Sequence, residues 1–163
     1  MKLYCFYNAA YKKIFKLFKE SLKVDHDIEL VPTEQDFTID LHNDLTVERI
    51  KKARYHHCLE VSNRKLDLIL EAIDQNENQN IIYSDVDIKI LQPFSHFIDG
   101  DLKNNDLLGI QAFAAPRSYL SSAFLAFTCT AKIHHFFSEI KKEINEPSGV
   151  TLEASLNQNL KNI

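Results

Sequence analysis

The stretch from Asn78 to Phe94, NQNIIYSDVDIKILQPF, places two carboxylates, Asp85 and Asp87, directly after an apolar run. The run IIY shows no alternation of apolar and polar residues, which is typical of a β-strand covered on both faces. A lone carboxylate inside such a core would have to lose its charge or find a partner. We therefore expect the two carboxylates to lie where a buried strand emerges from a sheet, and the strand to continue to Pro93.

The spacing of the two aspartates indicates a shared task. In a continuing strand, Asp85 and Asp87 would point to the same face, about 6.6 to 6.8 Å apart. Their repulsion is about 0.7 kcal/mol in water and about 3 kcal/mol at an effective dielectric constant near 20. A divalent cation removes it, and carboxylate oxygens suit Mg²⁺ or Mn²⁺. The alternative is a solvated face of an edge strand, with Lys89 balancing one charge.

The rest of the sequence predicts an α/β fold. Because strands and helices alternate along the chain, we expect one compact domain over residues 1–163, with a mixed, mostly parallel sheet flanked by helices. By their periodicity we predict strands over Lys2–Asn8, Asp27–Pro32, Asp106–Ala114 and Ser118–Cys129, and helices over Ala9–Lys23, Leu45–Ile73 with a break near Ser62-Asn63, Ile133–Ile144 and Leu152–Leu160.

Composition narrows the class of partner. The net charge is −4 and the lysines and arginines are scattered, so the chain lacks the basic surface that binds nucleic acid. Three glycines do not form a glycine-rich nucleotide loop. The N-terminus lacks a signal-peptide profile, and the longest uncharged stretch, Ser118 to Ala131, is shorter than the roughly 20 residues that span a bilayer. We expect a cytoplasmic protein without a transmembrane segment.

Cysteines and histidines are interpreted as structural. The three cysteines are odd in number and have no C-x-x-C pairing, which argues against disulfides and thiolate zinc sites and favours a reducing compartment. Adjacent helical residues point about 100° apart, so His56-His57 and His134-His135 cannot each hold one metal as an i, i+4 pair does. We therefore assign them to the core or the surface.

The segment IIYSDVDIKILQPF resembles the D-x-D segment of GT-A fold glycosyltransferases, in particular the nucleotide-diphospho-sugar transferases. Four further segments resemble parts of that family in the same order: NRKLDLILEAI (63–73), DLLGIQAF (106–113), SSAFLAF (121–127) and LEASLNQNL (152–160). The resemblance implies a Rossmann-like GT-A fold. It also implies that a sugar is transferred from a nucleotide-diphosphate donor to a glycan, protein or small-molecule acceptor that the sequence does not identify.

The resemblance also implies roles for single residues. Asp87 would bind Mn²⁺ or Mg²⁺ directly and act in catalysis, while Asp85 would complete the metal pair by holding the donor's ribose or a metal-bound water. The metal would stabilise the charge of the diphosphate. Asn8 would lie beside the base, and Lys65 with Arg64 would face the diphosphate. The other donor-binding residues implied are Tyr7, Ser84, Gln111 and Ser122.

The chain departs from the family pattern in two segments. Ser121 and Ala123 stand where the family has Asn and Gly, and alanine adopts positive φ less readily than glycine. Leu152 and Glu153 stand where it has Asp and Gln. A shift by one residue would let Glu153 serve as the second catalytic carboxylate beside Asp87.

Two alternatives remain open from the sequence. A hydrophobic strand followed by D-x-D also begins phosphotransferases in which the first aspartate, here Asp85, attacks phosphorus. Ile88 in place of the usual Thr or Gly and the absence of a clear later acidic pair argue against that chemistry. The other alternative is a catalytically impaired module that only binds nucleotide sugars.

Overall fold

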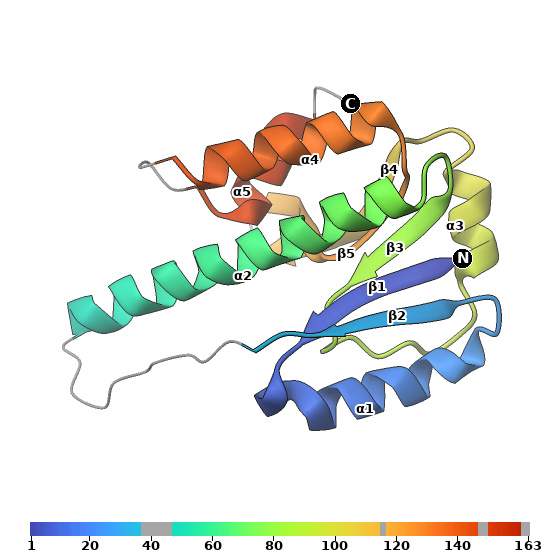
Figure 1. The fold of residues 1–163 in the computed structure, drawn as a ribbon, viewed down its shortest axis with the longest axis horizontal. Coiled ribbons are helices and arrows are strands. Elements are labelled where there is room, and N and C mark those ends of the chain that lie inside the picture. Colours follow the sequence, from blue (N-terminus) through green and yellow to red (C-terminus); the bar gives the residue numbers. More distant parts are fainter. Residues whose placement is uncertain (37–46, 115–116, 147–149, 161–163) are drawn as a thin grey trace.

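The computed structural model describes residues 1–36, 47–114, 117–146 and 150–160. They form a five-stranded sheet with helices on both faces (Figure 1). In chain order the elements are β1 (Lys2–Tyr7), η1 (Ala9–Tyr11), α1 (Lys12–Ser21), η2 (Leu22–Val24), β2 (Glu29–Glu34), α2 (Val47–Gln75), β3 (Asn80–Ser84), α3 (Ser95–Asp101), β4 (Leu107–Ala114), β5 (Arg117–Thr128), α4 (Ala131–Ile144) and α5 (Leu152–Asn159), where η1 and η2 are 3-10 turns.

The strand order β2-β1-β3-β5-β4 confirms the predicted mixed, mostly parallel sheet. β1 lies parallel to both β2 and β3, while β5 is antiparallel to both β3 and β4. Hence β5 runs in the opposite direction to the other four strands of this sheet. The carboxyl ends of β1, β2 and β3 therefore meet at one edge, which is where open α/β sheets bind ligands.

Side chains of the central strands alternate between two cores, as the period of two residues in a strand requires. α2, α4 and α5 cover one face of the sheet, whereas α1 and α3 cover the other (Figure 1). The strand residues packed against the first group are Tyr4, Phe6, Ile81, Tyr83, Leu125 and Phe127, and those packed against the second are Leu3, Cys5, Ile82 and Ala126. Both faces are apolar, which explains the continuous apolar runs in the sequence.

The predicted break in the second helix is wrong, because α2 runs unbroken through Ser62 and Asn63. An asparagine inside a helix interrupts it when its side chain competes for the backbone. Here the Asn63 amide instead exchanges two hydrogen bonds with Asn145 of α4, at 3.0 and 2.9 Å. The predicted start of this helix at Leu45 lies outside the described residues.

The prediction that the strand of the D-x-D segment continues to Pro93 is also wrong. β3 ends at Ser84, and the chain turns at residues 86–87. The same-face geometry expected for Asp85 and Asp87 therefore does not apply, although both do follow directly from a buried strand. The segment then enters α3, a short helix that the sequence did not predict.

Asp25 holds the segment that follows Asp87. Phe94, at the N-cap of α3, makes no side-chain cap bond. The buried Asp25 carboxylate supplies the cap, since it accepts from the backbone N–H groups of Phe94 and Ser95, both at 2.7 Å, and from the Ser95 hydroxyl at 2.8 Å. The Ser21 hydroxyl holds the same segment at a point closer to Asp87, where it accepts from the Ile90 backbone N–H at 3.1 Å.

The three cysteines are free thiols, of which Cys5 and Cys129 are buried and Cys58 is exposed. Burial raises the pKa of both buried thiols to about 12, and the charge of Asp85 adds to the shift at Cys5. In the part of the chain that the structure describes, none of the helices combines the length and apolar character needed to cross a membrane.

We expect Asp25→Ala to lower the free energy of unfolding by about 2 kcal/mol, because an N-cap and hydrogen bonds to a charged acceptor are lost. Burial is the largest single influence on the pKa of Asp25 and raises it, but the hydrogen bonds from Phe94, Ser95 and Asp27 together lower it below the usual 3.8. The contribution of Asp25 is therefore complete above pH 3.8 and is lost as the pH falls through the lower pKa of the folded state.

Urea unfolding at several pH values measures this effect. The difference between the wild type and Asp25→Ala should shrink in acid. Asp27→Ala is the matched control, because that side chain is exposed and should leave stability unchanged. Equal stabilities of the two variants would contradict the capping role of Asp25.

Candidate functional site

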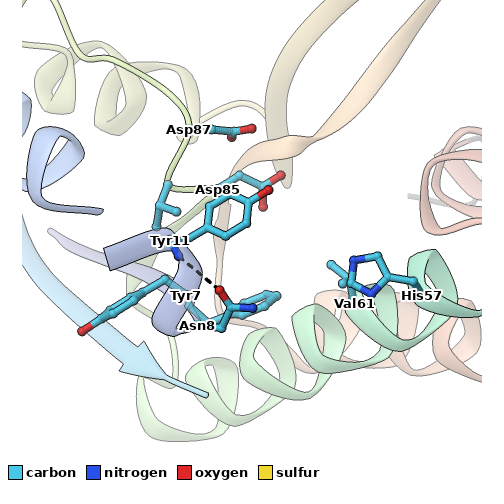
Figure 2. Close-up of a pocket in the computed structure, with 9 residues that line it drawn as sticks. Tyr7, Asn8, Tyr11, His57, Val61, Asp85 and Asp87 are labelled. Carbon is cyan, nitrogen blue, oxygen red and sulfur yellow. Dashed lines mark hydrogen bonds between the residues drawn. The ribbon is translucent and has the colours of Figure 1, made fainter. Parts of the chain in front are cut away.

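A pocket of about 160 Å³ lies at the carboxyl ends of β1 and β3 (Figure 2). Three segments build it: the end of β1 with η1, the middle of α2, and the turn after β3. The lining residues are Phe6, Tyr7, Asn8 and Tyr11 from the first segment, His57 and Val61 from the second, and Asp85, Val86 and Asp87 from the third. The position is the one expected for a ligand site in an α/β sheet.

The Asp85 carboxylate is held by partners from two elements. The Lys65 ammonium, from α2, lies 2.9 Å from Oδ1 and 3.0 Å from Oδ2 of Asp85. The Tyr83 hydroxyl donates to Oδ1 at 2.7 Å. Burial, followed by the charge of Asp85, raises the pKa of Tyr83 well above its usual value, so the hydroxyl keeps the proton that it donates. The Asp85 backbone N–H also donates to the Ala123 carbonyl of β5 at 2.8 Å.

Lys65 lies behind Asp85 and does not line the pocket. Its side chain is 6% exposed, whereas that of Asp85 is 31% exposed. Besides Asp85, the ammonium donates to the Ser122 carbonyl oxygen at 3.2 Å and to the Ser122 hydroxyl at 3.3 Å. A lysine ammonium has three N–H donors, so these acceptors occupy them all. In this arrangement Lys65 is the counter-ion of Asp85 and has no N–H directed at a diphosphate.

Asp87 is exposed and lines the same pocket as Asp85. Among the described residues, no cluster of three or more His, Cys, Asp or Glu side chains is arranged to hold a metal ion. Two carboxylates still suit Mg²⁺ or Mn²⁺, because these ions usually take one or two carboxylates and complete their shell with water and substrate phosphates. The donor set therefore fits a cation that arrives with an anionic ligand.

Tyr7 and Asn8, the two predicted residues at the end of β1, line the pocket, but both side chains also have structural partners. The Tyr7 ring stacks on Phe15 with centroids 4.0 Å apart, and its hydroxyl donates to Glu34 at 3.4 Å. Figure 2 shows this hydroxyl pointing away from Asp85 and Asp87. The buried Asn8 caps η1, because its Oδ1 accepts from the Tyr11 N–H at 3.2 Å.

Three other predicted residues do not line the pocket. Arg64 is held by Glu60 on the same helix, with its Nη2 2.9 Å from Oε1. Gln111 is exposed on β4. Ser84 is buried at the end of β3, where its hydroxyl donates to the backbone oxygen of Asp85 at 2.9 Å. Of the three, Ser84 supports the site most directly.

The β5 segment joins Asp85 to α5. Ser122 is buried beside Lys65, and its neighbour Ser121 donates to Glu153 of α5 at 3.4 Å. Glu153 is half-buried, does not line the pocket and lies next to Leu152, which is buried in the core. Ala123 does not adopt positive φ, since Asn78 is the one non-glycine residue with positive φ in the described part of the chain. Alanine therefore fits this extended segment without strain.

His57 lines the pocket, although its sequence context indicated a structural histidine. Figure 2 shows His57 and Val61 on α2, across the pocket from the segment that carries Asp87. The spacing of His57, Val61 and Lys65 is i, i+4, i+8, so one face of α2 brings all three toward the site. The sequence did contain a signal for His57, because residues four apart share a helix face and His57 lies eight residues before Lys65. Tyr11 also lines the pocket, although the sequence analysis placed it only within the predicted helix Ala9–Lys23 and gave it no role in the site.

Solved structures of three glycosyltransferases share this architecture. GlyE of Streptococcus pneumoniae TIGR4 gives a TM-score of 0.64 at 12% identity, over 99% of this chain and 43% of GlyE. The galactosyltransferase LgtC, solved with donor and acceptor sugar analogues, gives 0.53 at 13% identity over 96% of this chain and 69% of LgtC. A glycosyltransferase involved in glycosylating the major capsid of PBCV-1 gives 0.59 at 14% identity, over 99% of this chain and 75% of that enzyme.

The chain has the GT-A fold. This confirms the predicted fold. The chain spans less than half the length of the GlyE structure. No model of a protein family and no curated protein matches the sequence. The likeness to these enzymes therefore lies in the GT-A fold and not in overall sequence.

We expect Lys65→Met to lower the free energy of unfolding by about 1–3 kcal/mol, because Asp85 then keeps its charge without its counter-ion. Adding Asp85→Asn to Lys65→Met should recover part of the loss. Arg64→Met is the matched control on the same helix, since its exposed pair with Glu60 contributes at most about 1 kcal/mol. Urea unfolding measures all three variants. Equal losses for Lys65→Met and Arg64→Met would contradict the buried counter-ion.

Proposed function

We propose that the chain transfers a sugar from a nucleotide-diphospho-sugar donor to a glycan, protein or small-molecule acceptor. One observation carries the proposal: Asp85 is fixed at the end of β3 with the exposed Asp87 beside it, in a pocket at the carboxyl edge of a GT-A sheet. The glycosyltransferase structures that share the fold support the reaction class.

Mn²⁺ or Mg²⁺ is the cofactor that we propose for this site. Asp87 would bind the ion directly, because its carboxylate is exposed. Asp85 would complete the site through a metal-bound water or through a hydroxyl group of the donor's ribose. When bound, the ion would stabilise the charge that develops on the diphosphate as the sugar leaves. The phosphates and water would complete its coordination shell.

The walls of the pocket suggest how the donor is held. The Tyr11 ring and the Val61 side chain line the pocket and would pack against the donor, while Asp85 would accept from its hydroxyl groups. His57 adds a polar group across the pocket from Asp87. We keep Glu153 as the candidate second carboxylate in catalysis. Its bond to Ser121 ties it to the β5 segment that also contacts Lys65.

We also propose that the protein works in a reducing compartment such as the cytosol. Cys5, Cys58 and Cys129 are free, and two of them are buried thiols whose pKa is raised. Free cysteines are usual where glutathione and thioredoxin keep thiols reduced.

Asp87→Asn tests the metal role. We expect the variant to fold but to lose affinity for a nucleotide sugar in the presence of Mn²⁺ by more than about tenfold, because even outer partners of a bound metal contribute about 10- to 100-fold. Isothermal titration calorimetry with UDP-glucose and GDP-mannose, with and without Mn²⁺, measures the affinity.

Asp101→Asn is the matched control, since that aspartate is exposed on α3 and does not line the pocket. Unchanged metal-dependent affinity in Asp87→Asn would contradict the role of Asp87. Measuring sugar release from the same donors separates transfer chemistry from binding alone. Tight binding without any turnover would support the impaired binding module instead.

A further inference from the structure

Two buried tyrosines lie side by side in the sheet and differ in what their hydroxyl groups hold. Tyr4 of β1 and Tyr83 of β3 are register partners, exposed by 4% and 1%. The Tyr4 hydroxyl accepts from the Asn76 amide at 2.7 Å. The Tyr83 hydroxyl donates to Oδ1 of Asp85 at 2.7 Å. One tyrosine therefore bonds a buried structural amide, and the other bonds a carboxylate of the candidate site.

Lys65 alone does not select one orientation of the Asp85 carboxylate. Its ammonium lies at nearly equal distances from the two oxygens, 2.9 Å from Oδ1 and 3.0 Å from Oδ2. Ser122 occupies two of its three donors, so Lys65 makes one hydrogen bond to the carboxylate, to Oδ2, and a single bond lets the carboxylate turn about that contact. Tyr83 supplies the second fixed point, because its hydroxyl is carried by a fully buried ring and donates to Oδ1.

Counting acceptor positions shows what the Asp85 carboxylate can still offer a ligand. An ionised carboxylate offers about four lone-pair positions, two on each oxygen. The Tyr83 hydroxyl takes one position on Oδ1 and the Lys65 ammonium takes one on Oδ2, because the other two donors of Lys65 go to Ser122. Asp85 lines the pocket, so the position that remains on each oxygen is available to a ligand there only while the carboxylate keeps this orientation.

Building on the proposed function, we propose that Tyr83 is a positioning residue whose hydroxyl group fixes the Asp85 carboxylate so that its free acceptor positions can bind the nucleotide sugar or a water on its metal. Phenylalanine at this position would fill the same space in the core but would leave the carboxylate held by Lys65 alone. The role differs from that of a catalytic residue, because Tyr83 acts through Asp85 and does not line the pocket.

Tyr83→Phe and Tyr4→Phe form a matched pair for the test. Each removes one hydroxyl group and one hydrogen bond from a buried ring in the same part of the sheet. Two quantities are measured for both variants: the affinity for UDP-glucose and GDP-mannose with Mn²⁺ by calorimetry, and the orientation of Asp85 in crystal structures without ligand. Thermal unfolding reports the general cost of losing the hydroxyl.

We expect Tyr83→Phe to weaken nucleotide-sugar binding by about tenfold, as outer partners of a metal site do, and to show Asp85 turned or in several orientations. Tyr4→Phe should keep the wild-type affinity and the wild-type orientation of Asp85. The proposal is overturned if Asp85 keeps its orientation in Tyr83→Phe, or if both variants lose affinity equally.

The two measurements also separate this inference from the proposed function. If the wild type bound neither nucleotide sugar, the donor specificity assumed above would fail, while the orientation of Asp85 would still decide the role of Tyr83. A turned carboxylate in Tyr83→Phe alone would support positioning in that case, and an unmoved carboxylate would refute it.

Discussion

The ion pair between Lys65 and Asp85 is the contact on which the site depends. It joins the middle of α2 to the end of β3, and the two hydrogen bonds from Lys65 to Ser122 extend the link to β5. Burying a lysine ammonium is costly unless all its donors find acceptors. Asp85 and Ser122 supply those acceptors, so the position of α2 over the sheet and the position of the carboxylate are fixed together.

Fixing α2 in this way also shapes the pocket. His57 and Val61 lie two turns and one turn before Lys65, so the same helix face that binds Asp85 forms a wall of the pocket. The segment that carries Asp87 forms another wall of the pocket, and it is held by residues on the other face of the sheet. Ser21 at the end of α1 and Asp25 after η2 bind the backbone of the segment that leads from Asp87 into α3. The aspartates are thus held from both faces of the sheet, Asp85 by its side chain and Asp87 by its flanking segment.

The sequence predicted the fold well because the signals were local or periodic. Apolar runs marked β1 and β3, and helical spacing marked α1, α4 and α5. Long-range contacts explain the errors. Asn63 leaves α2 intact because it bonds Asn145, and α3 forms because Asp25 caps it; neither partner is near in the sequence. The same holds for the site. The local pattern of an apolar strand followed by two aspartates was enough to predict Asp85 and Asp87 as site residues. The ion pair between Lys65 and Asp85 joins two different elements and was seen only in the structure.

The central claim is that this GT-A sheet holds a nucleotide sugar through a divalent cation at Asp87, beside the fixed carboxylate of Asp85. A thermal-shift series on the wild-type chain tests it most directly, because a ligand that binds only the folded state raises the melting temperature by an amount set by its affinity. Nucleotide sugars with different bases are compared with and without Mn²⁺. The claim predicts a rise with at least one nucleotide sugar that is larger with Mn²⁺ than the effects of metal and nucleotide taken separately. No rise with any of them, or the same rise without metal, would contradict it.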